Sequence, residues 1–167
     1  MTAGGGRIGH GFGPVFDAGS RVLILGSFPS VKSREVGFYY GHPQNRFWRV
    51  LGRIMNDPAP EGIEEKKAYL SLHGVALWDS VVSCEITGSA DAAIRDPEPA
   101  DLTRILSVSK VGAIFCNGAL SYSLLQKNET LPKGLPVFRL PSTSPANAAW
   151  SLERLAEEWK IVSAYLQ

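Results

Sequence analysis

Apolar and polar residues alternate along the chain in blocks that predict strands alternating with helices. Short runs rich in β-branched residues and leucine, each ended by Gly, Ser, Asp, Asn or Pro, are typical of buried strands. The predicted strands are 21–27, 75–80, 111–118 and 136–145. Longer segments with apolar residues three or four positions apart predict amphipathic helices. The predicted helices are 42–55, 61–74, 100–110, 118–126 and 145–166.

This order of elements predicts an α/β protein of three layers, α/β/α, with a central, mainly parallel four-stranded sheet covered by helices on both faces. The length of 167 residues fits one domain. We expect residues 21–167 to form that domain. Residues 1–20, which begin MTAGGGRIGHGFG, are expected to be a flexible N-terminal lead-in.

Turn and cap residues predict where the helices begin and end. Pro43 suits the first turn of helix 42–55, which would also place Asn45 in that turn. Gly74 is expected to end helix 61–74 in a left-handed conformation. Ser144 is the expected N-cap of the last helix.

The four predicted strands all end in polar or glycine-containing segments. These ends are Gly26-Ser27-Phe28, Asp79-Ser80, Asn117-Gly118 and Ser142-Thr143-Ser144. Parallel sheets bind ligands beyond the carboxyl ends of their strands, so the four segments predict one site. The alternative is that they are ordinary turns, because every strand end needs turn residues.

Composition argues against a disordered or fibrous protein but does not identify a partner. Apolar residues make up 44% and charged residues 20% of the chain, and the formal net charge is +1, as in an ordinary globular protein. Five basic residues nevertheless gather near one another and form either a basic strip that attracts a polyanion or a solvated helix face. They are Lys32, Arg34, Arg46, Arg49 and Arg53.

Cysteine and histidine usage argues against a metal or a disulfide framework. Cys84 and Cys116 are the only cysteines, and the three histidines show no ligand spacing with acidic residues. We expect no metal and no other cofactor. The apolar runs are too short to cross a membrane, and the start lacks the apolar core of a secretory signal. A cytoplasmic monomer is therefore the default expectation.

Two turn segments are candidates for binding an anion. GSFPS, which includes Pro29 and Ser30, offers backbone N–H groups after a strand, although a plain tight turn explains it equally well. STSPAN, residues 142–147, places three hydroxyl groups before a predicted helix, where a phosphate oxygen would be stabilised. The patterns of a P-loop and of a dinucleotide-binding loop are absent.

The stretch GFYYGHPQNRFW, residues 37–48, mixes five aromatic residues with His42, Gln44, Asn45 and Arg46. Aromatic residues at a strand–helix junction are usually core. The polar groups among them would need partners in a core, which favours a platform on which a planar ligand stacks.

Taken together, these motifs resemble the uracil-DNA glycosylase superfamily. GFYYGHPQNRFW is similar to a segment of the mismatch-specific uracil/thymine glycosylase branch, and LILGSFPS with LPSTSPAN resembles the hypoxanthine-DNA glycosylase branch, its sixth family. The resemblance runs from about Val22 to the end. It implies the three-layer fold and base excision repair of DNA, in which a deaminated base, hypoxanthine or uracil, is flipped out and its N-glycosidic bond is hydrolysed.

The resemblance also implies roles for individual residues. Tyr40 matches the aromatic residue that stacks on the flipped base, and Asn45 matches a catalytic asparagine, which would position water or donate to the base. His42 would donate to the departing base or, alternatively, cap the helix. Gly26, Ser27 and Phe28 match the first motif, in which Phe28 replaces a water-positioning asparagine of the mismatch-specific branch.

Further matches concern the edge of the base and the DNA strand. Asp79 would accept N1–H of hypoxanthine, or have only a structural role, and Asn117 would line the pocket. Contacts to DNA are expected from Pro29, Ser30, Ser142, Thr143, Ser144, Pro145, Ala146 and Asn147.

Two departures from the family pattern leave a second hypothesis open. Ser142 stands where related proteins often carry a histidine, and Ala146 is a poor intercalating wedge. Because no lysine matches a Schiff-base position, we expect base removal without strand cleavage. The alternative is a non-catalytic nucleic-acid or nucleotide-binding module of the same fold, which Phe28 and Ser142 favour.

Overall fold

The computed structural model describes residues 6–86 and 94–166, and its centre is a parallel four-stranded sheet. The strands lie in the order β3-β2-β6-β7, and all three neighbouring pairs are parallel. Every residue of the inner strand β2 is buried. The bounds are Val22–Gly26 for β2, Val75–Asp79 for β3, Ile114–Asn117 for β6 and Val137–Leu140 for β7. The predicted strands and their parallel arrangement are confirmed.

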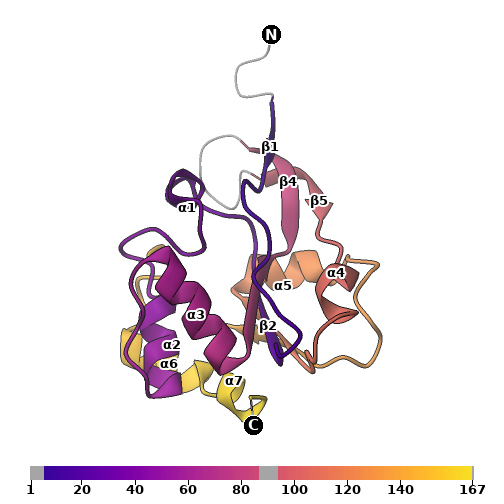
Figure 1. Ribbon diagram of the computed structural model, residues 1–167. Coiled ribbons are helices and arrows are strands. Elements are labelled where there is room, and N and C mark those ends of the chain that lie inside the picture. Colours follow the sequence, from indigo (N-terminus) through magenta and orange to yellow (C-terminus); the bar gives the residue numbers. More distant parts are fainter. Residues whose placement is uncertain (1–5, 87–93, 167) are drawn as a thin grey trace.

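Helices cover both faces of this sheet, which confirms the three-layer prediction. In Figure 1, α2, α3, α6 and α7 lie on one side of the sheet, and α4 and α5 lie on the other. A short helix, α1, follows β2 and was not predicted. The bounds are Val31–Val36 for α1, Phe47–Met55 for α2, Ile63–His73 for α3, Thr103–Leu106 for α4, Ala119–Leu125 for α5, Leu152–Trp159 for α6 and Ile161–Ala164 for α7.

A second sheet, absent from the sequence prediction, continues from the first. It is antiparallel, in the order β1-β4-β5, with bounds Arg7–Gly9, Val81–Ile86 and Ile94–Pro99. Only Ser80 separates β3 from β4, so one extended segment joins the two sheets. Val81, Cys84 and Ile86 of β4 pack with Phe28 in a small apolar cluster.

The described part of the N-terminal segment is structured, so the expectation of a flexible lead-in is wrong for residues 7–20. Arg7–Gly9 pairs with β4, His10 is buried, and Val15 exchanges two backbone hydrogen bonds with Leu77 at the outer edge of β3. This segment covers an edge strand that would otherwise expose its backbone groups. Residues 1–5, which belong to the same prediction, lie outside the described residues.

The last predicted helix begins seven residues later than expected. Ser151, not Ser144, is the N-cap of α6, and its hydroxyl accepts a hydrogen bond from the Arg154 N–H. The preceding loop is held by a guanidinium: Arg46 donates hydrogen bonds to the carbonyl oxygens of Ser144, Asn147 and Trp150. These carbonyls are therefore satisfied outside a helix.

Helix α2 also starts later than predicted. It begins at Phe47, so Pro43 and Asn45 precede it instead of forming its first turn. The N-cap residue is Arg46, and Asn45 Oδ1 accepts the N–H of Phe47 at 2.9 Å in the turn that leads into the helix. By contrast, Gly74 ends α3 with φ of 74°, which confirms the predicted left-handed cap.

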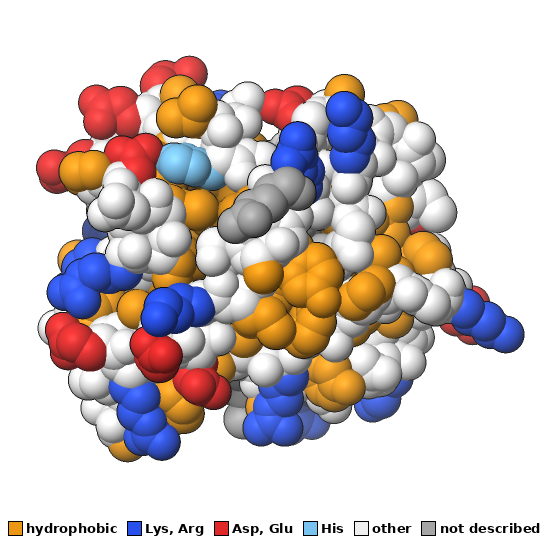
Figure 2. Space-filling view, turned by 90° about the horizontal axis from the view of Figure 1, so that it is seen from below, with side chains coloured by type: hydrophobic (Ala, Val, Ile, Leu, Met, Phe, Trp, Pro, Cys, Tyr) orange, Lys and Arg blue, Asp and Glu red, His pale blue; other side chains and the backbone are white. Residues whose placement is uncertain are grey.

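Four of the five clustered basic residues have separate partners instead of forming one basic face. Arg46 is bound to carbonyl oxygens, Arg34 lies over the Phe28 ring, Lys32 pairs with Glu35, and Arg53 pairs with Glu153. On the face shown in Figure 2, basic and acidic side chains are likewise interspersed around apolar ones. In the described ranges, no helix combines the length and apolarity needed to cross a bilayer.

Candidate active site

A pocket of about 350 Å³ lies at the carboxyl ends of the parallel strands, where the polar strand ends predicted it. It brings together all but one of the predicted site residues. They are Gly26, Ser27, Phe28, Pro29, Ser30, Tyr40, His42, Asn45, Asp79, Asn117, Ser142, Thr143, Ser144, Pro145 and Ala146. Asn147 is the exception; its amide donates to the Ser142 carbonyl.

The pocket also contains residues that the sequence did not indicate. Ser33, Ile86 and Ile94 line it beside Tyr39 of the aromatic stretch, and His10 lies behind Asp79. Ile86 and Ile94 come from the antiparallel sheet, which carried no recognisable signal in the sequence. Ser33 accepts the N–H of Gly41 at 2.9 Å and so fixes the turn before His42.

One side of the pocket, which we call the amide side, consists of Asn45, Asn117 and Thr143. Thr143 N–H donates to Asn117 Oδ1 at 3.0 Å, and Asn117 Nδ2 donates to Thr143 Oγ1 at 3.0 Å. Thr143 Oγ1 in turn donates to Asn45 Oδ1 at 2.8 Å. The three side chains come from the α2 entry, the end of β6 and the loop after β7, so the chain of hydrogen bonds ties three distant segments together.

Thr143 does not fit its predicted role as a DNA contact. Its side chain is fully buried, and its hydroxyl both accepts from Asn117 and donates to Asn45. Ser142 and Ser144 accept backbone N–H groups within their own loop, from Ser144 and Ala146. Because no helix begins there, the expected phosphate site at a helix N-terminus is absent from this loop.

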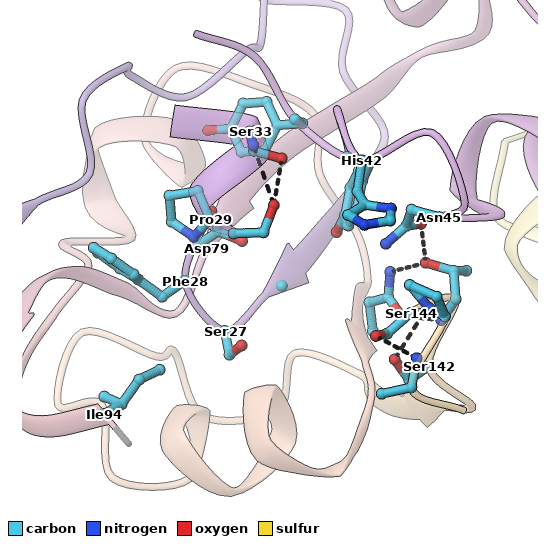
Figure 3. A pocket seen from close by; sticks show the side chains of 18 of the residues that line it. Ser27, Phe28, Pro29, Ser33, His42, Asn45, Asp79, Ile94, Ser142 and Ser144 are labelled. Atoms are coloured by element: carbon cyan, nitrogen blue, oxygen red, sulfur yellow. Dashed lines mark hydrogen bonds between the residues drawn. The ribbon is translucent and has the colours of Figure 1, made fainter. Parts of the chain in front are cut away.

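His42 lies beside Asn45 at the edge of the pocket (Figure 3). Its Nδ1 atom accepts the N–H of Gln44 at 3.1 Å, within the turn before α2. A backbone N–H can only donate, so a neutral His42 carries its proton on Nε2. The ring therefore offers a donor, and it stabilises the preceding turn without capping α2 itself.

A second group of pocket residues, which we call the carboxylate side, consists of Gly26, Tyr40 and Asp79. Asp79 is 3% exposed, and its Oδ2 lies 2.7 Å from His10 Nε2. A Cβ atom on residue 26 would overlap Asp79 Oδ1 and lie 3.2 Å from the Tyr40 hydroxyl. Because residue 26 is glycine, the Asp79 carboxylate and the Tyr40 hydroxyl can both lie close to its Cα atom.

Tyr40 has one ring face supported and a hydroxyl without a partner. Its ring stacks on Phe47 with centroids 4.0 Å apart, and its backbone has φ of 54°, an uncommon value for a non-glycine residue. Among the described residues, no group has hydrogen-bond geometry with its buried hydroxyl, although the Asn117 amide lies near it, and none with His10 Nδ1. Burial, together with the negative charge of Asp79, raises the pKa of Tyr40, so the phenol stays neutral.

The remaining aromatic residues of the stretch 37–48 are mainly core. Phe38, Tyr39, Phe47 and Trp48 are all buried. Most of the stretch is therefore core, as one interpretation held. Tyr40 alone among its aromatic residues is partly exposed and lines the pocket, as expected of a stacking platform.

Apolar side chains close the pocket away from the amide side. Figure 3 shows Phe28 and Ile94 across the pocket from Asn45, Ser142 and Ser144. Phe28 has no hydrogen-bonding group, so it cannot orient a water. Within the described residues, no three acidic, histidine or cysteine side chains gather as they would around a metal ion.

Comparison with known proteins places this fold and pocket in one class. The family model of the uracil DNA glycosylase superfamily matches residues 14–165, and the chain belongs to that superfamily. A hypoxanthine DNA glycosylase of Methanosarcina acetivorans is 35% identical over 93% of this chain and 98% of its own length. One from Methanosarcina barkeri is 37% identical over 53% of this chain and 57% of its own length.

A solved structure agrees with this assignment. The solution NMR structure of a candidate uracil DNA glycosylase from Methanosarcina acetivorans has a TM-score of 0.78 and 33% sequence identity to this chain. The similarity covers 93% of this chain and 96% of that one. The family assignment based on three sequence motifs is confirmed.

Proposed function

We propose that this protein is a monofunctional DNA glycosylase of base excision repair that removes a deaminated base, hypoxanthine first and uracil second. The observation that carries the proposal is the pairing of opposite hydrogen-bonding groups across one pocket. Asp79 supplies an acceptor on one side, and Asn45 and His42 supply donors on the other. The family membership and the names of the relatives support the same reaction.

Asp79 suits a base that has been deaminated. Deamination turns a ring nitrogen that accepts a hydrogen bond, in adenine or cytosine, into an N–H group beside a carbonyl in hypoxanthine or uracil. A buried carboxylate accepts that N–H, whereas it repels the lone pair of the parent base. Asp79 would thereby favour deaminated bases over their normal counterparts.

The hydrolysis itself needs charge stabilisation more than a strong base. The C1′–N bond breaks with its electron pair passing to the base, the oxygen of a water molecule bonds to C1′, and a proton from that water ends on the base. The departing base carries negative charge as the bond breaks, and preorganised donors such as Asn45 Nδ2 and His42 Nε2 stabilise it. Asn45 and His42 are therefore the proposed catalytic residues.

Binding of the flipped nucleotide uses the rest of the pocket. A base lying on the free face of Tyr40 would continue the stack that Phe47 begins, worth about 1–3 kcal/mol. Pro29 and Ser30 on one rim, with Ser142, Ser144, Pro145 and Ala146 on the other, would contact the strand on either side of it. Asn147, outside the pocket, supports the second rim.

A base-excision assay tests the proposal. Labelled duplexes that contain deoxyinosine, deoxyuridine, xanthine or a thymine mismatch are incubated with the protein and then treated with alkali, with unmodified adenine and cytosine duplexes as controls. We expect alkali-dependent breaks at deoxyinosine and deoxyuridine and none without alkali. Binding without abasic sites would instead support the non-catalytic module, which Phe28, with no group to orient water, favours.

A further inference from the structure

The carboxamide of Asn45 has one orientation only. Its oxygen is identified by the Phe47 N–H at 2.9 Å, since a backbone N–H cannot accept. The Thr143 hydroxyl, 2.8 Å away, is the second donor to the same oxygen. An sp² oxygen has two lone pairs, and both are used. Turning the amide over would set its NH₂ group against the Phe47 N–H and leave buried groups unsatisfied, at a cost of about 1–3 kcal/mol each.

The direction of the Thr143 hydroxyl is equally fixed. Asn117 Oδ1 accepts the Thr143 N–H, so the Asn117 atom that contacts Thr143 Oγ1 is the donor Nδ2. Thr143 Oγ1 already accepts that bond, and its single proton therefore points to Asn45 Oδ1. The backbone N–H of Thr143 thus fixes the orientation of the Asn117 amide. That amide fixes the direction of the Thr143 hydroxyl proton, and the hydroxyl fixes the orientation of the Asn45 amide.

No described residue accepts a hydrogen bond from Asn45 Nδ2. Figure 3 shows this nitrogen turned away from Thr143, toward the interior of the pocket. The face that Asn45 presents to a ligand consists of N–H groups. The oxygen that would accept a proton from an attacking water is turned away and saturated.

We propose that Asn117 and Thr143 are positioning residues that hold Asn45 as a pure hydrogen-bond donor, which acts on the leaving base and not on the water. This inference rests on the proposed function. The electron pair of the breaking C1′–N bond passes to the base, and Asn45 Nδ2 stabilises the atom that receives the charge. The water adds to C1′ without help from Asn45.

The substitution Asn45→Asp separates the two roles. Aspartate keeps an oxygen for Phe47 and Thr143 but presents a second, negatively charged oxygen to the pocket. If Asn45 is a donor, Asn45→Asp and Asn45→Ala should both lower the single-turnover rate on deoxyinosine duplexes by about 100-fold or more. An Asn45→Asp rate within about tenfold of the unmodified protein would overturn the donor role, since a carboxylate activates water better than an amide.

Thr143 is tested through its dependence on Asn45. Thr143→Val removes the hydroxyl at nearly constant shape and should lower the single-turnover rate about 10- to 100-fold with duplex affinity unchanged, whereas Thr143→Ser should restore the rate to within about threefold. In an Asn45→Ala background, Thr143→Val should change the rate less than twofold. An equal loss in both backgrounds would mean that Thr143 acts independently of Asn45, and the inference would fail.

A matched control is available away from the pocket. Thr130 also bonds through its hydroxyl to an asparagine, Asn128. Thr130→Val should lower thermal stability but leave the rate unchanged, which separates a general folding effect from positioning.

An NMR measurement decides the amide orientation without any assay of activity. In the proposed orientation the oxygen of Asn45, not its NH₂ group, faces the Phe47 amide proton, so no strong NOE joins the NH₂ protons to it. A strong NOE would overturn the inference even in an active enzyme. A protein that leaves every damaged duplex intact but lacks the NOE would instead refute the proposed function and keep the fixed orientation.

Discussion

The two sides of the pocket differ in how completely their polar atoms are satisfied. On the amide side, Asn117, Thr143 and Asn45 form a continuous chain in which each bond fixes the next. On the carboxylate side, the Tyr40 hydroxyl and His10 Nδ1, behind Asp79, are buried without partners among the described residues. On the amide side only the Asn45 Nδ2 group is left for a ligand, whereas the carboxylate side has buried polar atoms that its own residues leave unsatisfied.

This difference suits the two sides to different tasks, namely catalysis and recognition of the base. Groups that stabilise developing charge work best when they are held rigidly before the reaction, as the amide side is. Groups that recognise a base gain most when the base supplies the bond they lack, and a buried hydroxyl without a partner costs about 1–3 kcal/mol until it does. The amide side therefore suits chemistry, and the carboxylate side suits selection.

On the carboxylate side, the largest effect is expected from adding one methyl group. In Gly26→Ala the new Cβ would overlap Asp79 Oδ1 and crowd the Tyr40 hydroxyl. Because Asp79 and Tyr40 must then move, the single-turnover rate on deoxyinosine should fall about 100-fold. Gly112→Ala is the control, since its Cβ would meet no atom within 4 Å. Equal rates for the two variants would show that the carboxylate side tolerates displacement.

A smaller effect is expected when the charge alone is removed from this side. Asp79→Asn keeps the shape but replaces a charged acceptor, and one hydrogen bond to a charged group is worth about 1.5–3 kcal/mol. The rate on deoxyinosine should fall about 10- to 100-fold. The control is Asp57→Asn, because Asp57 pairs with His73 at 2.8 Å far from the pocket. An unchanged rate for Asp79→Asn would leave Asp79 with a structural role only.

Much of the fold could be predicted from the sequence, because the parallel strands have a clear apolar signature. VLILG of β2 and VALWD of β3 are apolar runs bounded by turn residues. The antiparallel sheet has no such signature: β5 reads IRDPEP and is almost wholly exposed. β5 pairs only with the neighbouring β4, and β4 pairs on its other side with β1 from the start of the chain, so local pattern could not indicate this sheet.

The site was predicted by position but not by hydrogen bonding. Strand-end residues and the segment 37–48 placed Asn45 and Thr143 in one pocket, but their bond joins residues 98 apart. Nothing local indicates which amide atom of Asn45 faces a ligand. His10 was assigned to a flexible segment, although it contacts Asp79, because one histidine between glycines carries no pattern.

Stability measurements should separate the two sides further. Tyr40→Phe removes a buried hydroxyl without a partner, so the free energy of unfolding at pH 7 should rise by about 1–2 kcal/mol. Thr143→Val removes a hydroxyl with two partners and should lower it by about 1–3 kcal/mol. Denaturant titration measures both. A loss of stability in Tyr40→Phe would show that its hydroxyl has a partner, and the contrast between the sides would disappear.

The smallest predicted effect is a difference in alkaline stability. Burial and the charge of Asp79 raise the pKa of Tyr40 and of Tyr39 above 10, the value of a free tyrosine. Above pH 10 the unfolded chain therefore loses phenolic protons that the folded chain keeps. The unfolded state then binds fewer protons, so the free energy of unfolding falls as pH rises.

Tyr40→Phe removes one of these phenols, because phenylalanine has no proton to lose. At pH 10.5 the variant should lose about 1 kcal/mol less stability, relative to pH 8, than the unmodified protein. Tyr39→Phe is a poorer probe, because the Tyr39 hydroxyl also donates to the Gly13 carbonyl at 2.9 Å. Denaturant titrations at pH 8 and 10.5 measure the difference. Equal losses of stability in both proteins would mean that the Tyr40 hydroxyl reaches solvent. Water could then hydrogen-bond to this hydroxyl, and the carboxylate side would not hold a buried hydroxyl without a partner.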